Sequence, residues 1–374
     1  MKKIIFIVFL FLSIVVERTY SQQAVPIDIV LCMDLSGSTN GLIENLRERI
    51  WDIANEINAY SPAASLRIGI VAYSRPQYKK ENYYVRVIAD LTDDIDFVQN
   101  ELFTIKTTTE QGSQYVGPAI YVSVSNMSWS KQKNAFKVLF IVGNGIVNLS
   151  GNDYIQACEK AVSKKIILNP VFCKTYMNVK EILQWRNLAE LGKGEYYEID
   201  INKKTFVIPT IYDVDYLREL NFQFNKTYVY YGLEGKKRFG IQEDLDNKAT
   251  AINEMSFQSR LVTKVSRFYQ ETNFAWDLVD LANRQQVDWS AIDRATLPEN
   301  LQKMNDDELK KYVDGKWSER RQIIGTIRIL CAKRTEIVKE KKRELKLSEG
   351  NTLGNVVIES MNKIAPEKGF KVGN

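Results

Sequence analysis

The sequence predicts an α/β fold with a doubly wound, mostly parallel sheet, followed by a mainly α-helical C-terminal domain. From Val25 to about Asp200, short apolar runs that suit buried strands alternate with amphipathic stretches that suit helices. From about Asn247 onward, apolar residues keep only helical spacing. The chain has 374 residues, which is enough for two domains or for one large domain with an extension.

The predicted strands are mostly continuous apolar runs, typical of a parallel sheet that is buried on both faces. They are 27–33, 66–73, 83–88, 136–142, 166–172 and 195–199, with 83–88 as an edge strand. The helices predicted between them are 42–57, 95–102, 116–126, 154–163 and 179–189. In folds of this class, ligands bind beyond the carboxyl ends of the central strands.

The C-terminal part is predicted from helical periodicity. Helices are expected over 249–269, 276–281 and from Asp306 to about Leu345, and a short strand over 228–232. The long helix fits three interpretations, which are a packed helix of the second domain, a coiled-coil or partner-docking helix, and a basic surface for an anionic partner. The predicted division is a signal peptide at 1–21, a first domain at 24–200, a linker or extension at 201–246 and a helical domain at 247–374.

The N-terminus has the pattern of an export signal. Lys2 and Lys3 precede an apolar stretch from Ile4 to Val16, and small residues surround Tyr20 at the expected cleavage point. We therefore expect an exported protein, periplasmic or secreted, without membrane insertion after cleavage. An uncleaved anchor is the alternative.

Composition excludes several classes of function. The sequence contains no histidine, which removes Ser-His-Asp and Cys-His catalysis and every imidazole metal site. The net charge of +5 is mild for this length and does not indicate a nucleic-acid binder. We expect no enzymatic activity. The four cysteines, Cys32, Cys158, Cys173 and Cys331, fit either disulfides of an exported protein or free buried thiols.

Polar oxygens follow the first predicted strand directly. Asp34, Ser36 and Ser38 lie on a short turn that contains Gly37 and opens the first helix. Carboxylate and hydroxyl oxygens are the ligands that Mg²⁺ or Mn²⁺ prefers. A turn and cap network that holds the helix would use the same residue types.

A strand, this Asp-x-Ser-x-Ser turn and a helix together resemble a von Willebrand factor type A (vWA) domain. The turn would be the first part of the metal-ion-dependent adhesion site of that family. The segments 66–73, 127–130 with 137–143, and 185–189 with 194–197 are similar to a group of secreted bacterial vWA-domain proteins, which carry a similar helical C-terminal half. The resemblance implies the α/β fold and a role in binding a protein or surface ligand.

The implied metal site departs from the family pattern at two places. The family expects a threonine before the helix at 116–126, where this chain has Gln114, and an aspartate after the fourth strand, where it has Asn144. The implied metal ligands are Asp34, Ser36, Ser38, Gln114 and Asn144. The implied ligand-binding face adds Thr39, Thr109 and Ser113. With one carboxylate where the family has two, we expect Mg²⁺ or Mn²⁺ to bind weakly or not at all.

Three functions are compatible with these residues. The first is a protein-binding or adhesion module that acts through the partly degenerate metal site. The second is a structural or assembly component of a cell-envelope complex that docks through the helical C-terminal half. The third, a carboxylate-dependent metal hydrolase, is disfavoured because the sequence has neither a histidine nor a paired-acid motif.

Overall fold

In this computed structural model the described residues are 24–78, 83–108, 110, 112, 115–148, 153–174, 179–201, 214–345 and 351–372. The predicted signal peptide at 1–21 and three predicted site residues, Thr109, Ser113 and Gln114, lie outside these ranges. Within the described ranges, no helix has both the length and the apolar character that crossing a bilayer requires.

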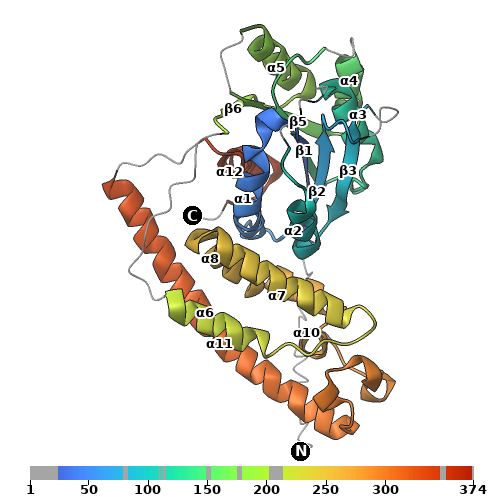
Figure 1. Cartoon of the computed structure of the whole chain (residues 1–374), viewed down its shortest axis with the longest axis vertical. Helices are drawn as coiled ribbons and strands as arrows, with labels where there is room; N and C mark the ends of the chain where they lie inside the picture. Colours follow the sequence, from blue (N-terminus) through green and yellow to red (C-terminus); the bar gives the residue numbers. More distant parts are fainter. Residues whose placement is uncertain are drawn as a thin grey trace, which may run out of the picture.

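A six-stranded sheet forms the centre of the first part, as the sequence predicted (Figure 1). The structure gives the strand order, which is β3-β2-β1-β4-β5-β6. Each strand is parallel to its neighbours except β3, which is antiparallel to β2. The strands are β1 (Val25–Asp34), β2 (Ala64–Tyr73), β3 (Val85–Thr92), β4 (Phe136–Gly143), β5 (Ile166–Cys173) and β6 (Tyr197–Ile199). The strand order reverses between β1 and β4, which is where ligands bind in open α/β sheets.

Helices cover both faces of the sheet because the side chains of β1 alternate between two cores. Ile29 and Leu31 point into a core shared with α1 (Gly41–Asn58) and α2 (Ile95–Thr104). Val30 and Cys32 point into the other core, with α3 (Val116–Asn126), α4 (Asp153–Ser163) and α5 (Val179–Gly192). All four cysteines are buried free thiols, and burial raises the pKa of Cys32 to about 12.

The second part of the chain consists of helices around the long helix α11 (Figure 1). They are α6 (Val214–Asn225), α7 (Gly235–Ile252), α8 (Glu254–Lys264), α9 (Arg267–Asn273), α10 (Leu278–Arg284) and α11 (Asp306–Glu344). A capping box between Asn305 and Glu308 starts α11. Leu309, Val313 and Ile327 of α11 are buried in two clusters with the other helices, so α11 is a packed helix of this part.

The helices of this part differ from the predicted ones in two places. The predicted linker, 201–246, includes α6 and much of α7. The predicted single helix at 249–269 is three helices, because Asn253 caps α8 by accepting from the Ser256 N–H at 2.8 Å and Ser266 caps α9. Such side chains satisfy the free N–H groups of a new helix start, which ends the preceding helix. The predicted strand at 228–232 is a single bridge between Tyr230 and Asp277.

The last helix, α12 (Leu353–Ile364), belongs to the core of the α/β part. Val357 and Met361 are fully buried in the cluster that contains α1 and β1. Polar contacts fix the same position, since Asn169 Nδ2 of β5 donates to Ser360 Oγ at 2.8 Å. The predicted helical domain at 247–374 therefore does not continue to the end of the chain, since residues 351–372 return to the sheet.

Buried charges join the helical part to α2. Arg260 of α8 is fully buried and donates through Nη2 to Asp96 Oδ2 of α2 and through Nε to Asp246 Oδ1 of α7, each at 3.0 Å. Lys264 Nζ lies 2.6 Å from Asp246 Oδ2, and burial lowers the pKa of Lys264 to about 8. Two bases and two acids thus neutralise one another at the junction, which fixes α8 against the α/β part.

A second buried ionic cluster lies inside the helical part. Arg320 of α11 donates through Nη1 to Asp277 Oδ2 and Asp280 Oδ1, both at 2.6 Å. Burial and the nearby Asp277 charge outweigh the attraction of Arg320 and raise the pKa of Asp280 to about 7.

We expect this cluster to make stability depend on pH. A carboxyl whose pKa is raised on folding contributes stability that is complete below its ordinary pKa and is lost as pH rises through the folded value, here about 7. The free energy of unfolding should therefore fall by about 2 kcal/mol from pH 5 to pH 8 on account of Asp280. Lys264 acts in the opposite direction near pH 8, so the measurement is the difference in denaturant unfolding between wild type and Asp280→Asn. Equal pH profiles of the two proteins would contradict the assignment.

Candidate functional site

Three predicted ligands meet at the carboxyl end of β1. Asp34 is fully buried, and its Oδ1 accepts the Ser36 N–H at 2.8 Å. The hydroxyl oxygens of Ser36 and Ser38 lie 3.1 Å apart, and Ser38 is exposed while Ser36 is buried. One carboxylate and two hydroxyls are thereby placed between the sheet and the surface.

Thr39 does not lie on an exposed face. It is fully buried, and its hydroxyl donates to the carbonyl oxygens of Asp34 and Ser36 at 2.8 and 2.9 Å. It therefore holds the turn closed, which is the cap and turn role that the sequence left open for this motif. The prediction that Thr39 faces a ligand is wrong for this reason.

The end of β4 packs directly against Asp34. A side chain at Gly143 would collide with the Tyr73 hydroxyl, and its Cβ would lie 2.9 Å from Asp34 Cβ. Asn144 follows immediately and is buried. Asp34 ends β1 and Asn144 directly follows β4, and these two strands border the reversal of strand order.

Tyr73 is a residue of this site that sequence reasoning missed. Its hydroxyl donates to the Val142 carbonyl at 3.2 Å. Burial, followed by the charge of Asp34, raises the pKa of Tyr73 well above its ordinary value. Tyr73 therefore stays neutral and acts as a spacer between β2 and β4. In the sequence, only its place at the end of a strand next to β1 could have indicated that Tyr73 belongs to this site.

Glu181 of α5 brings a second carboxylate to the same edge of the sheet. Its Oε2 accepts the Gly145 N–H at 3.2 Å, and the side chain is buried. Trp185 Nε1 donates to the Gly145 carbonyl at 2.9 Å, so α5 holds the loop after β4 from two sides. Nothing in the sequence distinguishes Glu181 from the other acids in first helical turns.

The loop before α3 is tied to the turn after β1. Gly37 N–H donates to the Glu110 carbonyl at 2.8 Å, and the Asn40 side chain both donates to and accepts from the Thr108 backbone. Arg75 adds hydrogen bonds to the carbonyls of Leu35 and Lys106. The loop that carries the predicted residues Ser113 and Gln114 therefore borders the Asp34 turn in its described portion.

The donor set fits a hard divalent cation only weakly. Among the described residues, the predicted donors Asp34, Ser36, Ser38 and Asn144 all offer oxygen, and of these only Asp34 carries charge. The Glu181 carboxylate accepts the Gly145 N–H and holds the loop after β4. In the part of the chain that the structure describes, no group of three or more His, Cys, Asp and Glu side chains is arranged to hold a metal. Mg²⁺ dehydrates reluctantly, so a single carboxylate favours weak binding with several retained waters.

No protein-family model matches the sequence, and no curated protein does either. The chain is similar to solved vWA-domain structures. A vWA protein from Catenulispora acidiphila matches at 12% identity and TM-score 0.36, over 48% of this chain and 40% of that one. An aerotolerance-related membrane protein from Bacteroides fragilis matches at 13% identity and TM-score 0.32, over 46% of this chain and 92% of that one. The pilus adhesin SpaC from Lactobacillus rhamnosus GG matches at 13% identity and TM-score 0.35, over 48% of this chain and 29% of that one. This chain thus matches less than half the length of two of these three proteins, and at such low scores the function has to rest on its own residues.

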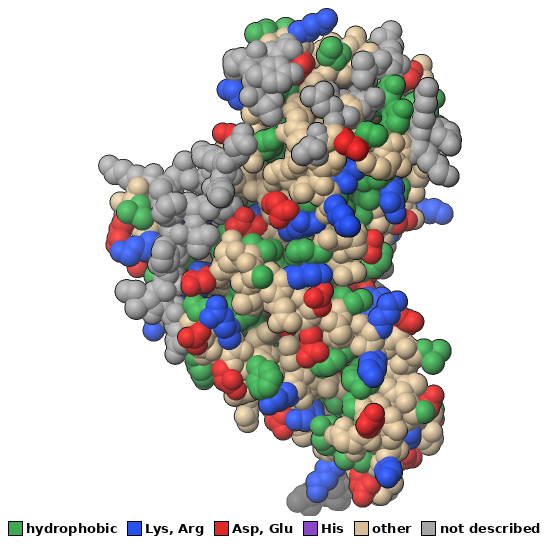
Figure 2. All heavy atoms as spheres, viewed as in Figure 1, with side chains coloured by type: hydrophobic (Ala, Val, Ile, Leu, Met, Phe, Trp, Pro, Cys, Tyr) green, Lys and Arg blue, Asp and Glu red, His purple; other side chains and the backbone are tan. Residues whose placement is uncertain are grey.

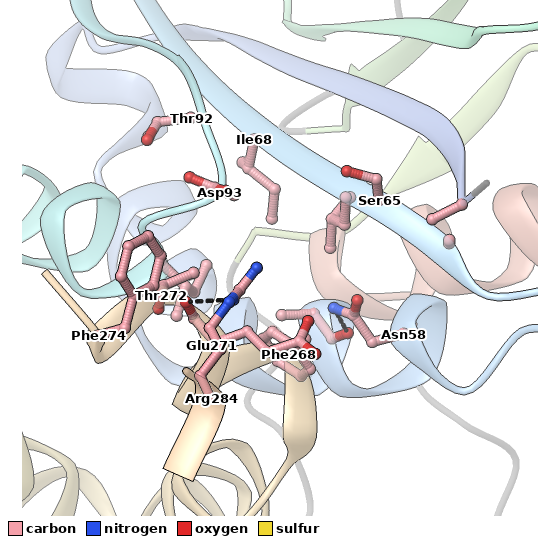
Figure 3. Close-up of a pocket in the computed structure, with 15 residues that line it drawn as sticks. Asn58, Ser65, Ile68, Thr92, Asp93, Phe268, Glu271, Thr272, Phe274 and Arg284 are labelled. Carbon is pink, nitrogen blue, oxygen red and sulfur yellow. Dashed lines mark hydrogen bonds between the residues drawn. The ribbon is translucent and has the colours of Figure 1, made fainter. Parts of the chain in front are cut away.

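A separate pocket lies at the opposite end of the sheet, between the two parts of the chain (Figure 3). It encloses about 250 Å³ and is lined by Ser65 at the start of β2, Asp93, Glu271 and Arg284, among others. Arg284 donates to the Glu271 carbonyl at 3.3 Å. None of the described candidate ligands, Asp34, Ser36, Ser38 and Asn144, lines this pocket, so it is distinct from the site around Asp34.

Proposed function

We propose that this chain is an exported vWA-type module that binds a protein or surface ligand through the edge of the sheet around Asp34. One observation supports the proposal, namely that Asp34, Ser36 and Ser38 share one turn beside Gly143, the residue before Asn144, where the strand order reverses. Ser38 is exposed there, so the turn that holds the buried Asp34 carboxylate reaches the surface. Similarity to vWA structures, including an adhesin, is compatible with such a role.

We further propose that Mg²⁺ or Mn²⁺ binds weakly at this edge. Asp34, Ser36 and Ser38 would hold the ion, with Asn144 close by as a neutral oxygen donor. The cation would supply a positive charge that attracts a carboxylate of the partner. Asp34 would lower the cost of holding that charge, and Thr39 would keep the turn in place.

The proposed role is binding rather than catalysis. The sequence has no histidine. Burial and charge keep Tyr73 neutral, and burial raises the pKa of each of the four thiols, so these side chains are poor nucleophiles. The N-terminal pattern supports export. On the face shown in Figure 2, basic and acidic side chains are interspersed, as expected for a protein that does not bind nucleic acid.

The test is a calorimetric titration of Mg²⁺ and Mn²⁺ into protein that begins at Gln22. We expect saturable binding with a dissociation constant of about 1 mM, and its loss in Asp34→Asn, because one carboxylate carries the charge of the site. The asparagine oxygen still accepts the Ser36 N–H, so the turn should persist. Asp93→Asn is the matched control, since Asp93 is exposed and follows β3 at the opposite end of the sheet. Absence of binding at millimolar metal, or equal binding by Asp34→Asn, would contradict the metal proposal.

A second candidate function is assembly through the helical part. Phe222 of α6 and Ile329 of α11 are 53% and 70% exposed, so both offer apolar surface to a partner. Deleting residues 247–374 would not test this role, because the deletion also removes α12 from the α/β core. Phe222→Ser with Ile329→Ser is the better variant. Loss of envelope association in this variant, with retention in Asp34→Asn, would favour assembly over the Asp34 site.

A further inference from the structure

The outer edge of the sheet is formed by β3, which pairs only with β2 within the described residues (Figure 1). Its first residue, Val85, lies beside Tyr73 and so at the same edge as the candidate site. Toward its other end, the Asp90 carboxylate accepts the N–H and hydroxyl of Ser128, so the loop after α3 lies against that end. Among the described residues, the stretch of the strand edge that no other element pairs with or covers is therefore Val85–Ile88, in which Arg86 is exposed.

A groove lies on the α3 side of this stretch. It has a volume of about 520 Å³. It is lined mainly by apolar and aromatic side chains, which are Tyr83, Val85, Val87, Pro118, Tyr121 and Val122. Tyr83 and Tyr121 are 54% and 49% exposed. Tyr83 and Tyr84 both pack on the Tyr115 ring, which holds this aromatic groove in shape.

A second groove lies on the α2 side of the same stretch and encloses about 250 Å³. Its charged lining comprises three bases, Arg75, Arg86 and Lys106, against the single acid Glu101. Arg86 is exposed and lines both grooves. The excess positive charge of this basic groove suits acidic side chains.

The two grooves match the geometry of a strand. Side chains alternate along β3, so Val85 and Val87 face the aromatic groove while Arg86 and Ile88 face the basic one. A further strand paired on the open edge would have the same alternation, and its side chains would enter the two grooves in turn. Backbone hydrogen bonds to β3 would supply affinity, and the grooves would select the side chains.

We propose that the Val85–Ile88 edge binds an extended peptide segment of a partner protein by strand addition. Apolar side chains of the segment occupy the aromatic groove and acidic side chains occupy the basic groove. A second copy of this chain is a poorer occupant. Pairing two β3 edges about a twofold axis would bring two Arg86 side chains together, and like charges on paired strands repel. This surface is separate from the Asp34 turn and does not require a metal.

The probe is a capped peptide of about eight residues that alternates valine with glutamate, a length typical of edge strands. Two controls are a scrambled peptide of the same composition and one that alternates valine with lysine. We expect binding of the alternating acidic peptide alone, with NMR shifts in the amides of 85–88. Binding of the scrambled or lysine peptide with equal affinity, or shifts confined to other residues, would overturn the proposal.

Charge reversal at the edge provides the second arm. Arg86→Glu should weaken the binding of the acidic peptide about tenfold or more, because it removes the base shared by both grooves and adds a repelling acid. Lys133→Glu makes the same charge change on the loop before β4, at the opposite end of the sheet, and should bind like wild type. Arg86→Glu should retain the metal titration of wild type, so failure of this proposal is distinguishable from failure at Asp34. Unchanged peptide binding in Arg86→Glu, or sedimentation of the wild type as a dimer that excludes the peptide, would overturn strand addition by a partner.

Discussion

Arg320→Met is expected to lower the free energy of unfolding by about 3–5 kcal/mol, because it leaves two buried carboxyls without their cation. Arg320 is fully buried, and its guanidinium reaches Asp277 and Asp280 at 2.6 Å and the Thr227 hydroxyl and carbonyl at 2.9 Å. Methionine fills a similar volume but donates no hydrogen bond. Chemical denaturation followed by circular dichroism measures the change.

The matched control lies one residue further along α11. Arg321 is exposed, so Arg321→Met should change stability by less than about 0.5 kcal/mol. The loss in Arg320→Met should also shrink as pH falls through the raised pKa of Asp280, since the protonated Asp280 carboxyl no longer needs a cation. A loss that is equal in the two variants, or independent of pH, would contradict the role of Arg320 as the counter-ion.

The α/β part could be predicted closely because its signals are local. The apolar runs at 27–33 and 136–142 lie within β1 and β4, and the predicted helix at 116–126 has the bounds of α3. A strand buried on both faces and an amphipathic helix can each be recognised from the hydrophobic pattern of a short segment. The prediction of a single helix over 249–269 was wrong because asparagine and serine, the residue types of the caps Asn253 and Ser266, also occur within helices. Only the packed structure decides which role they take.

The contacts that hold the two parts together could not be predicted in the same way. Arg260, Lys264 and Asp246 look like ordinary charges of an exposed helix face in the sequence. Their burial depends on Asp96 of α2, more than 100 residues away in the chain. Charge pairing between such distant residues leaves no periodic signal.

Only the part of the candidate site that lies within one short motif could be placed from the sequence. The turn from Asp34 to Ser38 places its own donors, so strand and turn together were sufficient. Asn144 was implied by the resemblance to the vWA family, whereas Tyr73 and Glu181 come from other elements and required the structure. Thr39 was assigned to the wrong side because hydroxyls that close a turn and hydroxyls that meet a ligand look alike in sequence.

Deletion of residues 351–374 is expected to prevent cooperative folding of the α/β part. Leu353, Val357 and Met361 are fully buried against α1. Removing each of these side chains would expose apolar surface of α1 and the sheet to water. Burial of a large apolar side chain contributes about 1.5–3 kcal/mol, so the three together approach the total stability of a typical domain. Removing only Gly373 and Asn374 is the control and should leave the melting temperature unchanged.

A point substitution separates packing from the loss of chain. Met361→Ala should cost about 2–5 kcal/mol in the full chain, since it opens a cavity between α12 and α1. Lys368→Ala, at an exposed position beyond the helix, should cost less than about 0.5 kcal/mol. If the deletion variant melts like the full chain, α12 is an appendage and the α/β part folds without it. If both variants lose stability as expected, the polypeptide leaves the sheet after β6, builds the helical part and returns to complete the first core. The helical part is then an insertion into the α/β fold, and its position is fixed at both ends by the chain itself.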